Sequence, residues 1–149
     1  MHIEDTSTVI EQPVQKVFDY VSNPVTYPEW IGPYVEVRDL QQSMPGELRE
    51  GDKFTADLKF LGRRVETTIE VTASEPNRRL KQRSIGGPVP IEVSLIFEEV
   101  PGGTRLTQSA ELEPPGGFFK LTGPLLERAV KRQFRNDQET LKDVLEAQG

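Results

Sequence analysis

Apolar and polar residues alternate with a period of two over much of the middle of the chain, from Gly51 to Leu112. This period is typical of β-strands that bury one face and leave the other in water. The alternation falls into five segments, separated by short runs rich in glycine, proline or asparagine that favour tight turns. The first apolar positions of these segments are Phe54, Val65, Leu80, Ile91 and Leu106. We therefore predict an antiparallel meander of five strands.

The chain before this meander has a mixed pattern. Residues 3–11 are rich in threonine, valine and isoleucine, which favours a first strand. Pro13 stands at a favourable first position for a helix, and apolar residues follow at helical spacing as far as Val21. Residues 27–30 suit one further helical turn, and residues 34–40 suit another strand. The predicted order is a strand, short helices, six strands and a long helix.

The long helix is predicted over residues 118–148, after the helix-breaking run at residues 114–117. Its apolar residues fall within one arc at about 100° per residue. They are Phe119, Leu126, Val130, Phe134, Leu141, Val144 and Leu145. Because Pro124 lies within the first turns, we expect a break or kink near Gly123. The apolar arc needs a partner, and the predicted sheet is the surface available to cover it.

Composition narrows the classes of function. A chain of 149 residues is most simply one domain, spanning residues 1–149. The formal net charge of −6 disfavours nucleic acid and anionic membranes as partners. No apolar run has the length needed to span a membrane, and the acidic N-terminus lacks the basic segment of a signal peptide. We expect a cytoplasmic protein, whose oligomeric state, monomer or dimer, stays open.

The residue inventory also restricts the chemistry. The chain has no cysteine, and its one histidine, His2, lies at the terminus, so triad-type nucleophilic catalysis is excluded. No spacing resembles a calcium loop or a zinc site, and we expect no metal and no cofactor. Catalysis, if present, would use a carboxylate, a tyrosine or an arginine.

Successive residues of a strand point to opposite faces of the sheet, so the position of each polar residue predicts the face on which it lies. A first set of polar residues lies on the same faces as the apolar residues. Each of them needs a hydrogen-bond partner in the protein, in water or in a ligand. The members of this first set are Thr67, Gln82, Ser84 and Gln108. A second set, of charged residues, lies on the opposite faces, and we expect these residues to be exposed to solvent. The members of this second set are Asp57, Lys59, Glu66, Glu70, Lys81, Arg83, Glu92 and Glu98.

Asp137 is the unusual residue of the predicted long helix, because its helical angle places it within the apolar arc. Desolvation there would raise its pKa. It is either a site residue or a residue that pairs with a nearby arginine or lysine where the helix leaves the core. Asp137 and Tyr27 are the two weak candidates for a catalytic group.

Several aromatic residues could line an apolar pocket or belong to an ordinary core. They are Tyr27, Trp30, Phe60, Phe97, Phe118 and Phe119. Phe118 and Phe119 follow two glycines, so this pair could also form a gate over a cavity.

A set of short segments, in this order and spacing, resembles the START-like superfamily, also called SRPBCC, which includes the birch-pollen-allergen fold. The nearest branch is the polyketide cyclase/dehydrase and lipid-transport group. The resemblance covers nearly the whole chain. The segments are Val9-Ile10-Glu11-Gln12-Pro13, Val17-Phe18-Asp19-Tyr20-Val21, Tyr27-Pro28-Glu29-Trp30, Gly51-Asp52-Lys53-Phe54, Glu75-Pro76-Asn77-Arg78-Arg79-Leu80 and Phe97-Glu98-Glu99-Val100-Pro101-Gly102-Gly103-Thr104-Arg105-Leu106.

The resemblance implies an α+β helix-grip fold. In this fold a curved, seven-stranded antiparallel sheet wraps around the long C-terminal helix, and two short helices follow the first strand. It also implies a cavity between sheet and helix that takes lipids, polyketides or other apolar molecules. Some members of such families catalyse cyclisation or dehydration, some only carry a ligand, and some act through protein partners, so membership leaves the function open.

Our leading hypothesis is a binding or carrier protein for a small hydrophobic molecule. A polyketide cyclase or dehydratase is the first alternative, and a protein-interaction module that uses Arg128, Arg132 and Arg135 is the second. The predicted ligand-binding residues are Tyr27, Trp30, Phe60, Thr67, Gln82, Ser84, Phe97, Gln108, Phe118, Phe119, Leu126 and Val130.

Overall fold

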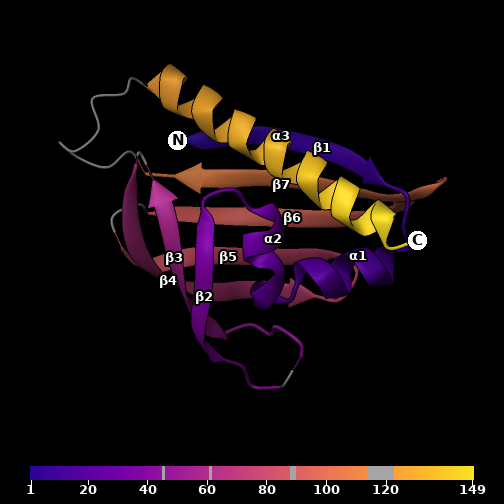
Figure 1. The fold of residues 1–149 in the computed structure, drawn as a ribbon, viewed down its shortest axis with the longest axis horizontal. Coiled ribbons are helices and arrows are strands. Elements are labelled where there is room, and N and C mark those ends of the chain that lie inside the picture. Colours follow the sequence, from indigo (N-terminus) through magenta and orange to yellow (C-terminus); the bar gives the residue numbers. More distant parts are fainter. Residues whose placement is uncertain (45, 61, 88–89, 114–122) are drawn as a thin grey trace.

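The computed structural model describes residues 1–44, 46–60, 62–87, 90–113 and 123–149 (Figure 1). Seven strands and four helical segments follow one another along these residues. They are β1 (His2–Ile10), α1 (Val14–Val21), the short 3₁₀ helix η1 (Pro24–Thr26), α2 (Tyr27–Trp30), β2 (Tyr34–Gln41), β3 (Lys53–Phe60), β4 (Arg63–Glu75), β5 (Arg79–Gly86), β6 (Ile91–Val100), β7 (Gly103–Leu112) and α3 (Gly123–Ala147).

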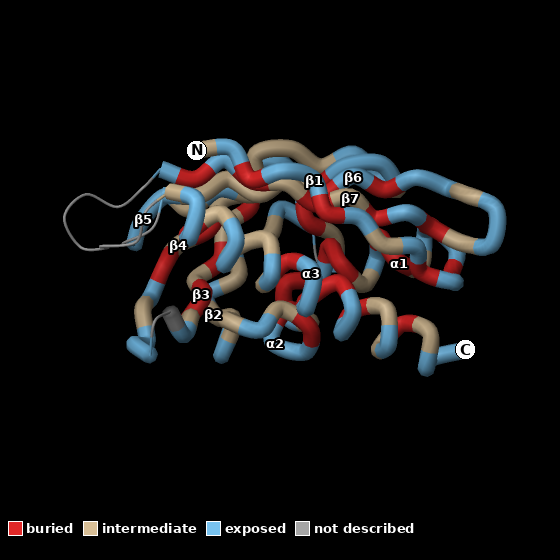
Figure 2. Tube along the Cα trace, turned by 90° about the horizontal axis from the view of Figure 1, so that it is seen from above, coloured by how far each residue is buried: buried red, intermediate tan, exposed pale blue. Residues whose placement is uncertain are grey.

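The strands form one antiparallel sheet in the order β1-β7-β6-β5-β4-β3-β2. Strands β2 to β7 are therefore a meander, and β1 joins it beside β7. The register of β6 and β7 runs unbroken from the Ile91–Leu112 pair to the Val100–Gly103 pair. Figure 2 shows that the sheet curves from β1, β7 and β6 round to β3 and β2, so that α3 lies within the curve. The helix-grip fold predicted from the sequence is confirmed.

Alternation along the strands explains the core. The inward residues of β3, β4 and β5 include Phe54, Ala56, Val71 and Leu80, each at most 1% exposed. This burial supplies the main stabilising free energy, at roughly 25 cal/mol per Å² of apolar surface. The tight turn before β7 requires glycine at Gly102, whose φ is +89°.

Asp57 corrects the prediction that the charged face is open to solvent. It lies on the outer face of β3 and yet is only 8% exposed. Arg38 on β2 and Arg64 on β4 both reach over it, with nitrogen–oxygen distances of 3.1 Å and 3.5 Å. The hydrogen bond from Arg38 holds the pKa of Asp57 below its usual value. Long arginine side chains from the two neighbouring strands therefore cover a carboxylate for which the alternation pattern predicts exposure to solvent.

Helix α3 crosses the concave face of the sheet beside β1 (Figure 1). Leu126, Phe134, Leu141 and Leu145 are buried, as the apolar arc predicted. Pro124 is the second residue of the described helix, where its missing N–H costs no intrahelical bond. The predicted start of the helix at Phe118 lies outside the described residues. The break or kink was expected near Gly123, which is the first described residue of α3, and the residues just before it also lie outside the described part of the chain.

Polar side chains fasten α3 to β1. The β1–β7 register shifts between Ile3 and Thr6, and Thr6, the first residue paired again, lies under the helix. Gln138 of α3 donates to this carbonyl at 2.8 Å, and Gln12 donates to the Leu145 carbonyl at 2.7 Å. Both glutamines are buried. These bonds anchor the C-terminal half of the helix on the sheet.

The short helices close one end of the structure. Helix α1 packs against the sheet through Phe18, whose ring lies 5.1 Å from that of Phe97 at the ring centroids. Helix α2 contacts both β2 and α3 (Figure 1). The connection after α2 also reaches α3, because the Gly32 N–H donates to Asp137 Oδ1 at 2.9 Å. In the part of the chain that the structure describes, no helix combines the length and the apolar character that crossing a membrane would need.

Candidate functional site

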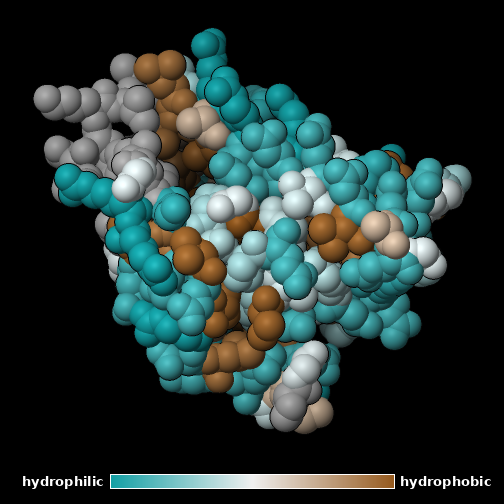
Figure 3. Space-filling model, viewed as in Figure 1, coloured by the Kyte–Doolittle hydropathy of each residue, from teal (hydrophilic) through white to brown (hydrophobic). Residues whose placement is uncertain are grey.

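A cavity of about 400 Å³ lies between the concave face of the sheet, the segment from α2 to β2, and α3. Most of its lining is aliphatic or aromatic. The apolar side chains include Leu58, Val65, Ile69, Val93 and Leu95 from the sheet and Leu126, Val130 and Phe134 from α3. On the face drawn in Figure 3, hydrophobic residues gather between the first half of α3 and the strands β2 and β3, within a largely hydrophilic surface.

Eight of the twelve predicted ligand-binding residues line this cavity. They are Tyr27, Trp30, Thr67, Gln82, Ser84, Gln108, Leu126 and Val130. Phe97 shares the inward face but packs against Phe18 of α1, and it is not part of the lining. The side chain of Phe60, and the whole of Phe118 and Phe119, lie outside the described residues, so the predicted gate cannot be placed.

Two hydroxyl groups of the lining have partners at the end of β5 and the start of β6. The Thr67 hydroxyl donates to the Gly86 carbonyl, and the Ser84 hydroxyl oxygen accepts from the Ile91 N–H at 3.0 Å. Both groups were predicted to need partners, and here the protein supplies them.

Two amides of the lining are also partnered inside the protein. Gln82 donates to the Tyr27 hydroxyl oxygen, and the side-chain oxygen of Gln108 accepts from Gln138 at 3.3 Å. The polar residues of the sheet therefore do not depend on a ligand for these bonds. A ligand that covers them does not have to replace the bonds that they already make.

Three aromatic residues form one wall. The Tyr27 ring contacts Trp30 and Tyr34 edge to face, with centroids 6.0 Å and 5.5 Å away. Burial raises the pKa of Tyr27 and of Tyr34, so both phenols stay protonated at neutral pH. They can donate hydrogen bonds but are poor bases. Trp30 is 2% exposed, and its indole N–H has no acceptor among the described residues.

Asp137 reaches the cavity from α3 and is 3% exposed. Its Oδ1 accepts from the Gly32 N–H at 2.9 Å and from Gln133 Nε2 at 2.7 Å. Burial raises the pKa of the carboxyl to about 6, although both hydrogen bonds act in the opposite direction. Among the described residues no arginine or lysine pairs with Asp137, so the expected pairing with a cation is not seen there. Asp137 is a buried carboxylate held by neutral donors.

Gly32, Gln133 and Tyr34 are not among the site residues predicted from the sequence. Gln133 lies one helical turn before Asp137, and this spacing was a usable signal. Gly32 gave no comparable signal, because its role depends on the close approach of its backbone to α3. A Cβ atom at Gly32 would lie 2.6 Å from Gln133 Nε2.

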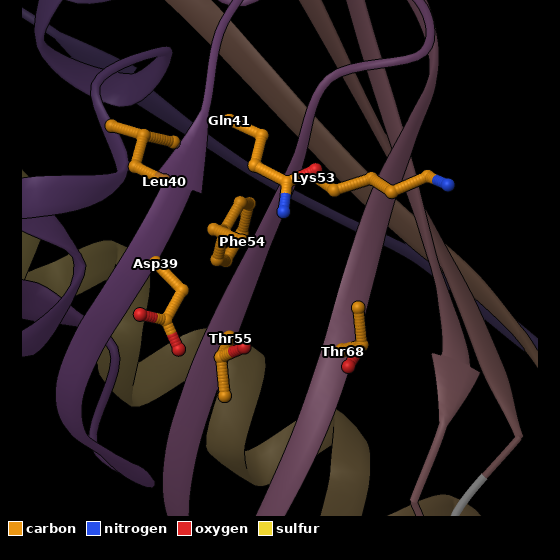
Figure 4. A pocket seen from close by; sticks show the side chains of 7 residues that line it. All are labelled: Asp39, Leu40, Gln41, Lys53, Phe54, Thr55 and Thr68. Carbon is orange, nitrogen blue, oxygen red and sulfur yellow. The ribbon is translucent and has the colours of Figure 1, made fainter.

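A second depression, of about 450 Å³, lies over β2, β3 and β4 (Figure 4). Its lining includes consecutive residues of one strand, such as Lys53, Phe54 and Thr55, which alternate between the two faces of the sheet. In Figure 4, Lys53 and Leu40 point in opposite directions. These side chains do not converge on a common point. Among the described residues, no group of three histidine, aspartate or glutamate side chains could hold a metal ion. The cavity under α3 is therefore the candidate site.

Solved structures share this fold. A START superfamily protein from Mycobacterium smegmatis matches with a TM-score of 0.84 and 14% identity, over 100% of both chains. The Zhui aromatase/cyclase from Streptomyces sp. R1128 matches with a TM-score of 0.74 and 17% identity, over 98% of this chain and 93% of that one. At such identities the likeness shows the fold alone.

Sequence comparison identifies the family. A search among curated proteins found no match. The model of the family described as polyketide cyclase / dehydrase and lipid transport, however, matches residues 1–146. This is nearly the whole chain, and it agrees with the resemblance seen in the sequence. The chain therefore belongs to the polyketide cyclase/dehydrase and lipid transport family.

Proposed function

We propose that this protein binds a small hydrophobic molecule in the cavity between the sheet and α3, as a binding or carrier protein. The observation that carries the proposal is the cavity itself, about 400 Å³ in volume and lined mostly by apolar side chains. Ligand sites of proteins are typically concave, mostly apolar and about 300–1,000 Å³ in volume. At the packing density of protein interiors, about 0.75, this cavity would hold a molecule of about 300 Å³.

Apolar contact would supply most of the affinity. Burying about 300 Å² of apolar ligand surface contributes roughly 7.5 kcal/mol at 25 cal/mol per Å². The loss of translational and rotational freedom reduces this figure, so we expect dissociation constants in the micromolar range or weaker.

The proposal is testable with a neutral apolar dye, N-phenyl-1-naphthylamine. Trp30 is the one tryptophan of the chain and lines the cavity, so energy transfer to the dye reports binding at this site. Ala129 is an exposed residue of α3 that also lines the cavity, and a phenylalanine there would enter the space. Ala129→Phe should weaken dye binding at least about tenfold.

The matched control is Ala147→Phe, the same change at an exposed position of the same helix outside the cavity. This control should bind the dye as the wild type does. The proposal is wrong if the wild type shows no energy transfer from Trp30, or if both variants bind the dye equally well.

A second candidate function is catalysis of proton transfer, because Asp137 is a cavity carboxylate whose pKa of about 6 suits a general base. One structural neighbour is an aromatase/cyclase. On this account the protein should accelerate exchange of the methyl protons of 2-acetonaphthone in D₂O, followed by proton NMR. Asp137→Asn should lower this rate about 10²-fold or more. Wild-type protein that binds the ketone without accelerating exchange would exclude this role for the carboxylate.

A further inference from the structure

The two oxygens of the Asp137 carboxylate have different surroundings. The N–H of Gly32 and Nε2 of Gln133 both donate to Oδ1. No donor among the described residues reaches Oδ2. The residue is 3% exposed and belongs to the lining of the cavity. Oδ2 is not among the fully buried side-chain atoms that lack a partner, so it is accessible from the cavity. A ligand that excludes water from this oxygen must supply a donor in its place, because a carboxylate oxygen desolvated without a donor is costly.

The described lining offers no cation to this carboxylate. Arg83 and Lys59 border the cavity, but they alternate along their strands with inward residues, so their side chains belong to the outer face. Arg83 binds Glu70 there at 2.9 Å, and the side chain of Lys59 is exposed. The two phenols of the lining, Tyr27 and Tyr34, are neutral. The described lining therefore has negative character and offers no positive group to an anionic ligand.

We propose that the cavity selects a neutral apolar molecule whose hydroxyl group donates a hydrogen bond to Oδ2 of Asp137, and that it disfavours a ligand with a carboxylate at that point. This inference rests on the proposed function and names the ligand class for the same site. Hydrogen bonds to an ionised acceptor are about twice as strong as neutral ones. Two carboxylates at that point would instead repel each other across a medium that screens charge poorly.

The test compares 1-decanol with decanoate, two chains of equal length that differ in the head group. Each ligand displaces N-phenyl-1-naphthylamine at pH 8, below its own aggregation limit, where both Asp137 and decanoate are ionised. The wild type should bind decanol at least about tenfold more tightly than decanoate. Asp137→Asn, an amide of the same shape, should reduce this ratio at least about tenfold.

The control variant is Asp143→Asn, the same change at an exposed position of α3 outside the cavity. It should keep the wild-type ratio. The inference is overturned if Asp137→Asn keeps the wild-type ratio of the affinities for decanol and decanoate. It is also overturned if the wild type binds the dye but decanol and decanoate displace it equally well. Absence of dye binding in the wild type would instead overturn the proposed function itself.

A third ligand makes the test independent of any variant. Decyl methyl ether keeps the chain and the oxygen of decanol but has no proton to donate. The wild type should bind it at least about tenfold more weakly than decanol, because the donor to Oδ2 is missing. Equal binding of the ether and the alcohol would overturn the inference.

Discussion

Asp137 shows how one residue joins the fold to the candidate chemistry. Its helical position places it among apolar residues, and Gly32 and Gln133 hold its Oδ1. Burial makes the ionised form unfavourable and raises the pKa to about 6, from the usual 3.8. The folded protein therefore binds a proton more tightly at this residue than the unfolded chain does.

This shift predicts how stability depends on pH. Between about pH 4 and pH 6 the folded state holds more protons than the unfolded state, so the free energy of unfolding falls as the pH rises. Asp137→Asn removes the titration and keeps an oxygen for Gly32. Its free energy of unfolding should match the wild type near pH 4 and exceed it at pH 8, by about 3 kcal/mol at most. Urea unfolding at both pH values measures the difference.

Asp143→Asn, an exposed change on the same helix, is the control for this prediction. A variant at position 137 that is less stable than the wild type at pH 8 would contradict the account. It would mean that the ionised carboxylate contributes more through its hydrogen bonds than it loses through burial.

Helical periodicity identified Asp137 in the sequence, but it could not identify the donor of its main-chain hydrogen bond. Gly32 lies 105 positions earlier, in the connection from α2 to β2. A pattern within one helix reports which side of it is buried, and it carries no information about which loop reaches that side.

The strands show the same limit. Alternation predicted the inward faces and the order of the elements, and both are confirmed. Val93, Leu95 and Phe97 share one face of β6, but only Val93 and Leu95 line the cavity, while Phe97 contacts α1. Alternation along a strand predicts the face on which a residue lies. The position of the residue along the strand decides whether it lines the cavity or contacts α1.

The pairing of β1 with β7 depends on Gly103. A Cβ atom at this position would lie 2.0 Å from the Ile10 carbonyl oxygen, a main-chain atom that cannot turn aside. Gly103→Ala should therefore lower the free energy of unfolding by about 3 kcal/mol or more, as expected for severe overpacking. Chemical denaturation measures the loss.

Gly102→Ala is the matched control, one residue earlier in the same turn. A Cβ atom there would meet nothing within 4 Å, although the φ of +89° disfavours alanine. We expect a cost of about 1–2 kcal/mol. Equal losses in the two variants would show that turn conformation, and not the contact with β1, determines the effect.

On the scale of the whole molecule, the sheet curves around α3 (Figure 2), and a cavity of about 400 Å³ lies between the sheet, α2 and α3. Buried glutamines and β1 fix the C-terminal half of α3, whereas the cavity lies under its N-terminal half. One half of the helix therefore completes the core, and the other half forms a wall of the candidate site.

The central claim is that this cavity is where a hydrophobic ligand binds, and isotope-filtered NMR of the protein with N-phenyl-1-naphthylamine tests it most directly. The account predicts nuclear Overhauser contacts from the dye to methyl groups of Val65, Ile69 and Leu126, which line the cavity. Contacts confined to exposed methyl groups outside the lining, such as those of Val25 and Ile96, would contradict it.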